Sequence, residues 1–241
     1  RNAVPAYNYP AYTITNHRLL EMPVRTSALR SLGATANVFS IESMMDVIAH
    51  ARGEDPVAFR LRHLDDERAR EVIKAAARRM GWDTRKKKDG TGYGIAYAKY
   101  KNLGAWCAVI AEVEAEKDIA VKRLTIAIDA GEVINPDGLI NQTEGGAIQA
   151  VSWALKEAVR FDDTRITSID WETYPILKFS EVPAVEVEIV SRPDERALGA
   201  GEASQGPTVG AIANALHDAL GVRVCDLPLT FDRVVAAMHK A

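Results

Sequence analysis

The sequence is poor in cysteine and has no long apolar run. Among its 241 residues there are two cysteines, Cys107 and Cys225, which lie far apart and match no zinc-binding or redox spacing. An iron–sulfur cluster needs about four thiolates, so this chain alone cannot hold one. No apolar run approaches the roughly 20 residues that a membrane-spanning helix requires. The sequence therefore excludes a self-contained iron–sulfur protein and a chain built around a helical membrane span.

Net charge and histidine are also limited. The formal net charge is −3, so no overall field attracts the chain to nucleic acid or to an anionic membrane, and we expect no nucleic-acid partner. The basic run at residues 85–88 stands beside Asp83 and Asp89 and predicts a solvated loop. No histidine pairs with another at metal-ligand spacing, so we expect no metal ligand among His17, His50, His63, His217 and His239.

The first 36 residues have little helical periodicity and are rich in proline, tyrosine, asparagine and threonine. This composition predicts an extended segment. Because such a segment cannot satisfy its own backbone groups, we expect residues 1–36 to pack against a partner or a missing region. The chain begins at Arg1 without an initiator methionine, so we expect it to start after a cleavage or inside a longer product.

Residues 37–81 carry the start and stop signals of a helical unit. Apolar residues recur at helical spacing in its first part. Asp55 stands before a proline and predicts the N-cap of a short second helix. Asp65 or Asp66 can cap a third helix, and Gly81 is suited to the left-handed position that ends it.

Residues 92–241 mix the two kinds of periodicity and predict an α/β unit, so the expected class is α+β with antiparallel hairpins. The expected elements are strands at 105–116 and 119–130 joined by a tight turn, a helix at 138–159, a strand at 183–191, a helix from Pro207 to Gly221, a short strand at 222–224 and a polar C-terminal helix.

The spacing of the glycines at residues 90–94 is superficially similar to that of a dinucleotide-binding loop. A working loop of that type follows a strand and opens a helix, whereas a strand-like stretch follows here. Phosphate binding at this position is therefore disfavoured.

Two other segments have unusual composition. In residues 131–146 an Asn-Pro-Asp-Gly turn leads into a helix with Gln142 and two glycines. This segment is either a well-capped surface helix or a helix N-terminus that meets an anionic ligand. In residues 199–207 three glycines flank Glu202 just before the helix expected from Pro207. This segment is either an exposed loop or a place where a ligand comes close to the backbone.

Four segments, in order along the chain, resemble the molybdopterin-binding large subunits of the xanthine dehydrogenase/aldehyde oxidase family. They are residues 25–34 (Arg-Thr-Ser-Ala-Leu-Arg-Ser-Leu-Gly-Ala), 55–64 (Asp-Pro-Val-Ala-Phe-Arg-Leu-Arg-His-Leu), 129–149, which contain Asn-Pro-Asp-Gly-Leu-Ile-Asn-Gln-Thr-Glu-Gly-Gly, and 199–207 (Gly-Ala-Gly-Glu-Ala-Ser-Gln-Gly-Pro). The nearest subgroup comprises isoquinoline-oxidoreductase-like and nicotinate-dehydrogenase-like subunits. The chain resembles about the last third of such a large chain, because the early Gly-Gln-Gly cofactor loop is absent.

The resemblance implies a molybdenum hydroxylase that oxidises an aldehyde or an N-heteroaromatic compound with oxygen derived from water. The implied cofactor is molybdenum–molybdopterin in its cytosine dinucleotide form, and the cofactor carries the redox chemistry. The implied partners are the remaining part of the large subunit, a two-cluster iron–sulfur subunit that receives the electrons, and a cytochrome or flavin subunit.

The resemblance also implies roles for five residues. Glu202 matches the family's base, Gln142 matches a glutamine that hydrogen-bonds the pterin, and Gly201 and Ser204 lie where the cofactor is contacted. Arg30 lies where some members hold a substrate-stabilising arginine, whose charge steadies developing negative charge.

The sequence departs from the family pattern at two of these places. Arg25 lies near Arg30 and the surrounding residues are altered. Ser204 and Gln205 replace the paired prolines that follow the glutamate in xanthine dehydrogenases, which argues against purine substrates.

Two other functions remain open from the sequence. One is a structural or assembly module of the same fold that binds no cofactor. The other is a hydrolase that uses Glu202 and His217, which requires the two side chains to converge.

Overall fold

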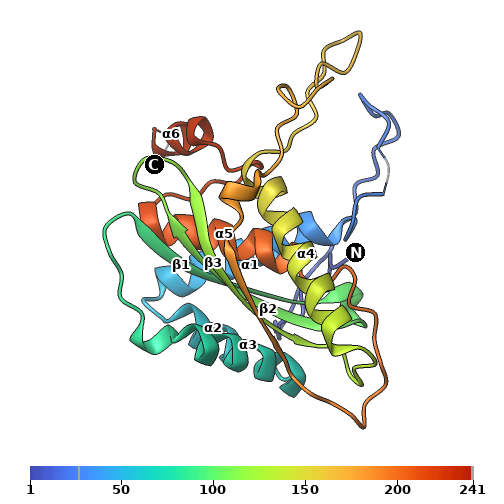
Figure 1. The fold of residues 1–241 in the computed structure, drawn as a ribbon, viewed down its shortest axis with the longest axis vertical. Coiled ribbons are helices and arrows are strands. Elements are labelled where there is room, and N and C mark those ends of the chain that lie inside the picture. Colours follow the sequence, from blue (N-terminus) through green and yellow to red (C-terminus); the bar gives the residue numbers. More distant parts are fainter. Residues whose placement is uncertain (27, 240–241) are drawn as a thin grey trace.

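Four strands form one sheet in the residues that the computed structural model describes, which are 1–26 and 28–239 (Figure 1). The strands lie in the order of the sequence: β1 (Thr91–Lys99), β2 (Trp106–Glu114), β3 (Ala120–Asp129) and β4 (Ala184–Ile189). β1, β2 and β3 pair antiparallel, and β4 joins β3 in parallel. The predicted α+β class is confirmed.

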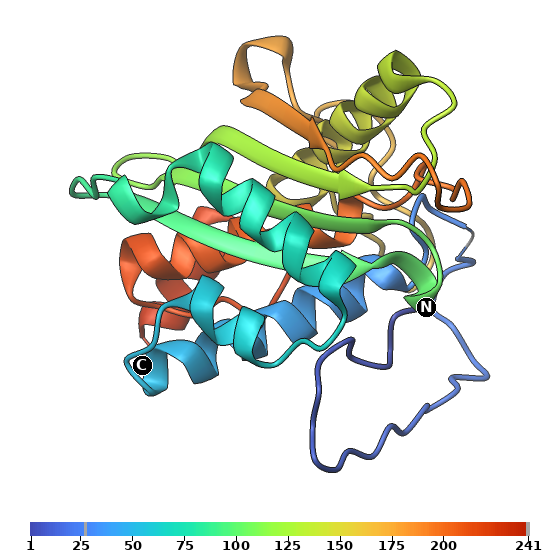
Figure 2. The same ribbon diagram turned by 90° about the horizontal axis from the view of Figure 1, so that it is seen from below.

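Helices cover both faces of the sheet (Figure 2). On one face, α5 (Gln205–Leu220) packs on β1 and β2, with α1 (Ala34–Ala51) and α4 (Pro136–Leu155) against it. On the other face, α3 (Glu67–Met80) packs on β2 and β3, next to α2 (Pro56–Arg62). Alternate residues of β2 enter the two apolar clusters, Val109 toward α5 and Ile110 toward α3. A short α6 (Phe231–Met238) is the last helix of the described residues.

The capping signals of the helical unit are confirmed. The Asp55 carboxylate accepts hydrogen bonds from the first turn of α2, and Asp66 does the same for α3. Gly81 ends α3 with a φ of 73°, which is the left-handed region that glycine enters without a steric penalty.

Two expectations about local structure are wrong. Residues 222–224 form no strand, because the side chains of Val222 and Val224 fill the apolar cluster under α5 instead of pairing with a neighbour. The hairpin between β2 and β3 has five connecting residues, 115–119, and a register shift at Glu112/Val113 rather than a tight turn. The strand expected at 183–191 is confirmed as β4, and the structure adds that it pairs with β3 in parallel.

The glycines of β1 allow α5 to approach the sheet closely. A Cβ atom added at Gly92 would overlap the carbonyl oxygen of Ala215, and one at Gly94 would overlap the Ala215 nitrogen. Both glycines lie inside β1, which leads through a short turn into β2 and not into an α-helix, so the glycine spacing of this segment has a packing cause.

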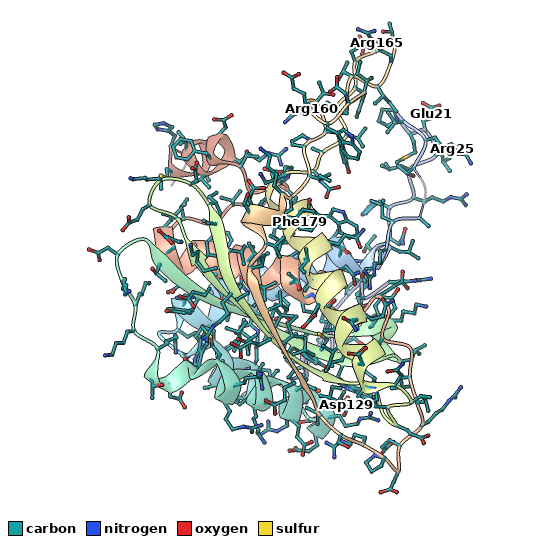
Figure 3. All side chains as sticks on the ribbon, viewed as in Figure 1. Glu21, Arg25, Asp129, Arg160, Arg165 and Phe179 are labelled. Carbon is teal, nitrogen blue, oxygen red and sulfur yellow. The ribbon has the colours of Figure 1, made fainter. Side chains whose placement is uncertain are left out.

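Two segments project from the sheet and its helices (Figures 1 and 3). One is the stretch near residues 10–26, where Glu21 and Arg25 lie; the other connects α4 to β4 and carries Arg160 and Arg165. Both expose apolar side chains, among them Leu20 and Trp171. By contrast, residues 1–9 pack on this chain itself, where Asn8 donates to the His63 carbonyl oxygen at 2.8 Å. No helix among the described residues has the length and apolarity to cross a membrane.

A buried ion pair links four segments at the β1 edge of the sheet. Arg60 of α2 donates through Nε to Oε2 of Glu42 on α1 at 2.8 Å, and both side chains are almost completely buried. The Tyr7 hydroxyl donates to Glu42 Oε1 at 2.7 Å, and the Tyr97 backbone nitrogen of β1 donates to Oε2 at 3.1 Å. Burial raises the pKa of Glu42, and Arg60 opposes that shift. The N-terminal segment, α1, α2 and β1 therefore depend on one carboxylate.

We expect Arg60→Met to lower the free energy of unfolding by about 3–5 kcal/mol, because it leaves a buried charge without its partner. Chemical denaturation at neutral pH measures the loss. The control is Arg62→Met, because Arg62 lies on the same helix as Arg60 and also pairs with a glutamate, Glu54, but is 54% exposed. That change should cost less than about 1 kcal/mol. Equal losses in the two variants would contradict a structural role for the buried pair.

Candidate active site

Glu202 lies directly before the N-terminus of α5. The helix begins at Gln205, and Ser204 at its N-cap position makes no side-chain capping bond. The N-terminus of a helix carries a partial positive charge, which favours a nearby carboxylate. Ala203 and Ser204, which follow Glu202, are buried, whereas Gly201 before it is exposed and 32% of the Glu202 side chain is exposed. Buried residues thus anchor the backbone on one side of Glu202, while its carboxylate can still be reached from solvent.

Each oxygen of the Glu202 carboxylate has a donor from a distant segment. The backbone nitrogen of Ser31 donates to Oε1 at 2.8 Å. The Tyr100 hydroxyl donates to Oε2 at 2.5 Å. Arg1 Nη1 donates to the Tyr100 hydroxyl oxygen at 2.6 Å and lies 3.4 Å from Glu202 Oε2.

These donors hold Glu202 in its ionised form. The hydrogen bond from Tyr100 lowers the pKa of Glu202, and the bond from Ser31 acts in the same direction against partial burial. Burial and the same hydrogen bond raise the pKa of Tyr100. The proton therefore stays on the phenol at neutral pH, and the carboxylate is free to accept one.

Backbone strain is concentrated around this carboxylate. Within the described residues, five non-glycine residues have positive φ: Asn2, Ser31, Leu32, Lys101 and Asn102. Ser31 binds Glu202, and Lys101 directly follows Tyr100. Asn2 joins the group, because its side chain bonds the Lys99 carbonyl oxygen at 2.8 Å and the Lys101 nitrogen at 2.8 Å. Such conformations cost about 1–3 kcal/mol each and cluster at functional sites.

Arg30 ties the Glu202 segment to α4. Its Nε donates to the Gly201 carbonyl oxygen at 2.6 Å, and its Nη2 donates to Oε1 of Gln142 at 2.6 Å and to the Gln142 carbonyl oxygen at 3.0 Å. The buried Gln205 amide, oriented to satisfy its neighbours, also accepts from Nε. Burial lowers the pKa of Arg30, and the charge of Glu202 opposes that shift.

The structure therefore brings four of the five predicted residues into one cluster around Arg30: Glu202, Gly201, Gln142 and Arg30 itself. The fifth, Ser204, lies next to them, but its hydroxyl donates to the Thr143 carbonyl oxygen of α4 at 3.0 Å. Arg25, the other arginine of that region, lies out on the projecting segment (Figure 3).

Of the two alternatives for residues 131–146, the structure shows the capped helix start. α4 begins at Pro136 and is capped by Asn135, whose side chain accepts from the Gly138 nitrogen at 2.9 Å. Gln142 stands about 9 Å of helix rise beyond that end. The uncapped N-terminus beside Gln142 and Glu202 is that of α5.

Sequence reasoning missed Tyr100, Ser31 and Arg1. No local pattern connects them to Glu202, because their contacts span between 102 and 201 residues of chain. A weak signal exists for the Tyr100 turn, since asparagine at position 102 is a residue that tolerates positive φ.

Sequence reasoning also missed a cluster at the far end of α5. His50 and His217, which have no sequence pattern in common, meet with ring centroids 5.1 Å apart beside the buried Asp46. Arg223 Nη2 donates at 2.7 Å to Asp46 Oδ2, the oxygen nearest both imidazoles. The three side chains of Asp46, His50 and His217 have the spacing of metal ligands, and Arg223 already pairs with the Asp46 carboxylate that both imidazoles face. His217 is about 18 Å of helix rise from the start of α5, so it does not converge with Glu202 as a hydrolase would require.

Comparison with known proteins identifies the family of this chain. Residues 31–183 match the molybdopterin cofactor-binding domain family. The chain belongs to this family. It is 38% identical to a nicotinate dehydrogenase subunit of Pseudomonas putida over 99% of this chain and 21% of that protein. It is 33% identical to the beta subunit of isoquinoline 1-oxidoreductase of Brevundimonas diminuta over 91% of this chain and 29% of that protein. The predicted resemblance is confirmed.

Solved structures of molybdenum hydroxylases share the fold. Quinoline 2-oxidoreductase from Pseudomonas putida 86 superposes with a TM-score of 0.74 at 14% identity, over 88% of this chain and 53% of that one. Aldehyde oxidoreductase from Desulfovibrio gigas superposes with a TM-score of 0.72 at 16% identity, over 89% of this chain and 42% of that one. At these identities the likeness concerns the fold. The chain spans less than a third of the length of the curated relatives named above.

The donor set beside Glu202 fits part of a molybdopterin. The uncapped N-terminus of α5 is suited to an anionic or polar group. Arg30 donates to the amide oxygen of the exposed Gln142, whereas the Gln142 amide nitrogen has no partner among the described residues. A Cβ atom at the neighbouring Gly145 would meet nothing within 4 Å, which leaves this side of α4 open.

The approach of α4 to the Glu202 segment depends on Gly146. A Cβ atom there would overlap the Ser204 hydroxyl and lie 3.0 Å from the Gln205 amide. We expect Gly146→Ala to cost about 1–3 kcal/mol of stability, because overpacking forces the segments apart. Gly145→Ala on the same helix should be neutral or stabilising by up to about 1 kcal/mol. Thermal unfolding measures the stability of both variants. A loss of stability of similar size in both would refute the packing argument.

Proposed function

We propose that this chain is part of a molybdenum hydroxylase and that Glu202 is its catalytic base. The proposed substrate is an aldehyde or an N-heteroaromatic compound, hydroxylated with oxygen derived from water. The carrying observation is the strained convergence of three distant segments on one ionised, partly exposed carboxylate. Membership of the molybdopterin-binding family supports the cofactor class, and the named relatives support the substrate class.

The chain's own residues divide the work. Glu202 accepts a proton when the substrate is attacked, and a positioned base of this kind contributes about 10²–10⁴-fold to the rate. The free amide nitrogen of Gln142 and the backbone at Gly201 and Ser204 would hold the pterin side of the cofactor. The bound molybdenum–molybdopterin would supply the two-electron oxidation.

Arg30 is proposed to stabilise developing negative charge on the substrate. Its Nε and Nη2 groups donate hydrogen bonds to Gly201 and Gln142, and these bonds fix the position of the guanidinium. Nη1 has one contact, at 3.4 Å to Gln149, and is the group available for a substrate. A fixed charge of this kind needs no reorganisation during the reaction.

The remaining components are proposed from the relatives, which are named as subunits. They are the rest of the large subunit, a two-cluster iron–sulfur subunit and a cytochrome or flavin subunit. The cofactor is proposed to be the cytosine dinucleotide form. The exposed apolar side chains of the two projecting segments are candidate contacts for the rest of the large subunit.

Glu202→Gln should lower kcat of the assembled enzyme by about 10²–10⁴-fold, because the amide cannot accept the proton while its shape is preserved. Turnover per bound molybdenum measures the effect. Glu195→Gln is the matched control, since Glu195 lies in the same connection with a 55% exposed side chain. Turnover of Glu202→Gln within about tenfold of the unchanged enzyme, with molybdenum retained, would show that Glu202 is not the base.

The alternative, a structural or assembly module without cofactor, gives a different result. Metal and pterin analysis of the purified complex should then find no stoichiometric molybdenum. Our proposal expects one molybdenum and one pterin for each copy of this chain.

A further inference from the structure

We propose that Tyr100 is a positioning residue whose hydroxyl keeps the proposed base Glu202 ionised while the enzyme turns over. This inference rests on the proposed function and goes beyond it, because it assigns a role to a residue outside the family's motif segments described above. The geometry that carries it is a three-member chain, in which Arg1 donates to the Tyr100 oxygen and Tyr100 donates to Glu202.

The phenol is held firmly enough to act in this way. Tyr100 is 6% exposed and begins the turn η2 (Tyr100–Asn102) between β1 and β2. Its backbone nitrogen donates to the Ala105 carbonyl oxygen at 2.9 Å, and its carbonyl oxygen accepts from Gly104 at 2.7 Å. The two residues that follow it have φ of 56° and 60°, a conformation that the rest of the fold must impose.

The direction of the hydroxyl is set by its neighbours. Arg1 has no acceptor atom on its guanidinium, so the Tyr100 oxygen must accept from it. The phenol proton is then left to point at Glu202 Oε2. Hydrogen bonds in such a chain polarise and strengthen one another.

The other charged groups that face Glu202 act in the same direction. Arg1 lies 3.4 Å from Oε2, and Lys101 and Arg30 are the further cations near the carboxylate. After the phenol hydroxyl is removed, Arg1 at 3.4 Å is the donor that remains at Oε2, and its bond is longer than the 2.5 Å bond that is lost. Oε1 keeps its bond to Ser31, so the aim of the carboxylate survives and only its basicity changes.

The consequence is a trade between ionisation and basicity. Donation from Tyr100 lowers the pKa of Glu202, so more enzyme carries the active carboxylate in mildly acidic solution. The same donation makes the carboxylate a weaker base once it is ionised. In the proton transfer, Glu202 gains the proton of the water-derived hydroxyl group that is transferred to the substrate, and Tyr100 keeps its own proton. No oxidant beyond the bound cofactor is required.

The test is the pH profile of kcat/KM for Tyr100→Phe in the assembled enzyme, expressed per bound molybdenum. Removing the hydroxyl raises the pKa of Glu202, so the acid limb moves to higher pH. We expect a loss of about tenfold on the acid limb and a rate within about twofold of the unchanged enzyme on the alkaline plateau. Dividing the rate by the amount of bound molybdenum keeps the comparison valid if part of the protein does not bind the cofactor.

Tyr174→Phe is the matched control. The Tyr174 hydroxyl also donates to a glutamate, Glu157, at 2.7 Å, but it does so on the connection between α4 and β4. Its pH profile should coincide with that of the unchanged enzyme.

Two results would overturn the inference. A uniform loss at every pH would mean that Tyr100 only supports the local structure, and an unchanged profile would mean that it has no role. Failure of the proposed function is separate, because it appears as activity retained by Glu202→Gln. If Glu202→Gln is inactive and Tyr100→Phe keeps the original profile, only the role of Tyr100 is rejected.

Discussion

The site depends on the hydrogen bonds that fix one carboxylate between distant parts of the chain. Glu202 receives a backbone N–H from Ser31 and a phenol O–H from Tyr100, and its own backbone is tied to α4 through Arg30. These contacts explain why the turns that supply them adopt positive φ. Strain of this kind persists only where surrounding structure imposes it, and here the sheet, α1 and α5 do so.

The helices provide the frame for these contacts through close backbone approach. Gly92 and Gly94 bring α5 onto β1, and Gly146 brings α4 onto the start of α5. The buried pair of Glu42 and Arg60 fixes α1, whose preceding turn carries Ser31. The small residues and the ion pair therefore act on the site indirectly, by setting the positions of its donors.

Local residue patterns predict the helices and their ends, whereas contacts between distant segments are predicted only where the family resemblance names the residues. The caps at Asp55 and Asp66 and the glycine stop at Gly81 place two helices correctly, because each signal acts within one turn of helix. The sequence also places Glu202 correctly before α5, although the helix begins two residues before Pro207. The parallel pairing of β4 and the donors to Glu202 could not be predicted, because they follow from tertiary packing. The bond from Tyr100 joins residues 102 positions apart.

Our central claim is that this strained carboxylate serves the molybdenum cofactor. The most direct measurement is an experimental structure of the assembled, cofactor-loaded enzyme. We expect Glu202 to lie within hydrogen-bond reach, about 2.6–3.2 Å, of a ligand of the molybdenum, with the bonds from Tyr100 and Ser31 retained. A loaded structure in which Glu202 faces away from the metal, or in which another carboxylate takes that position, would contradict the claim.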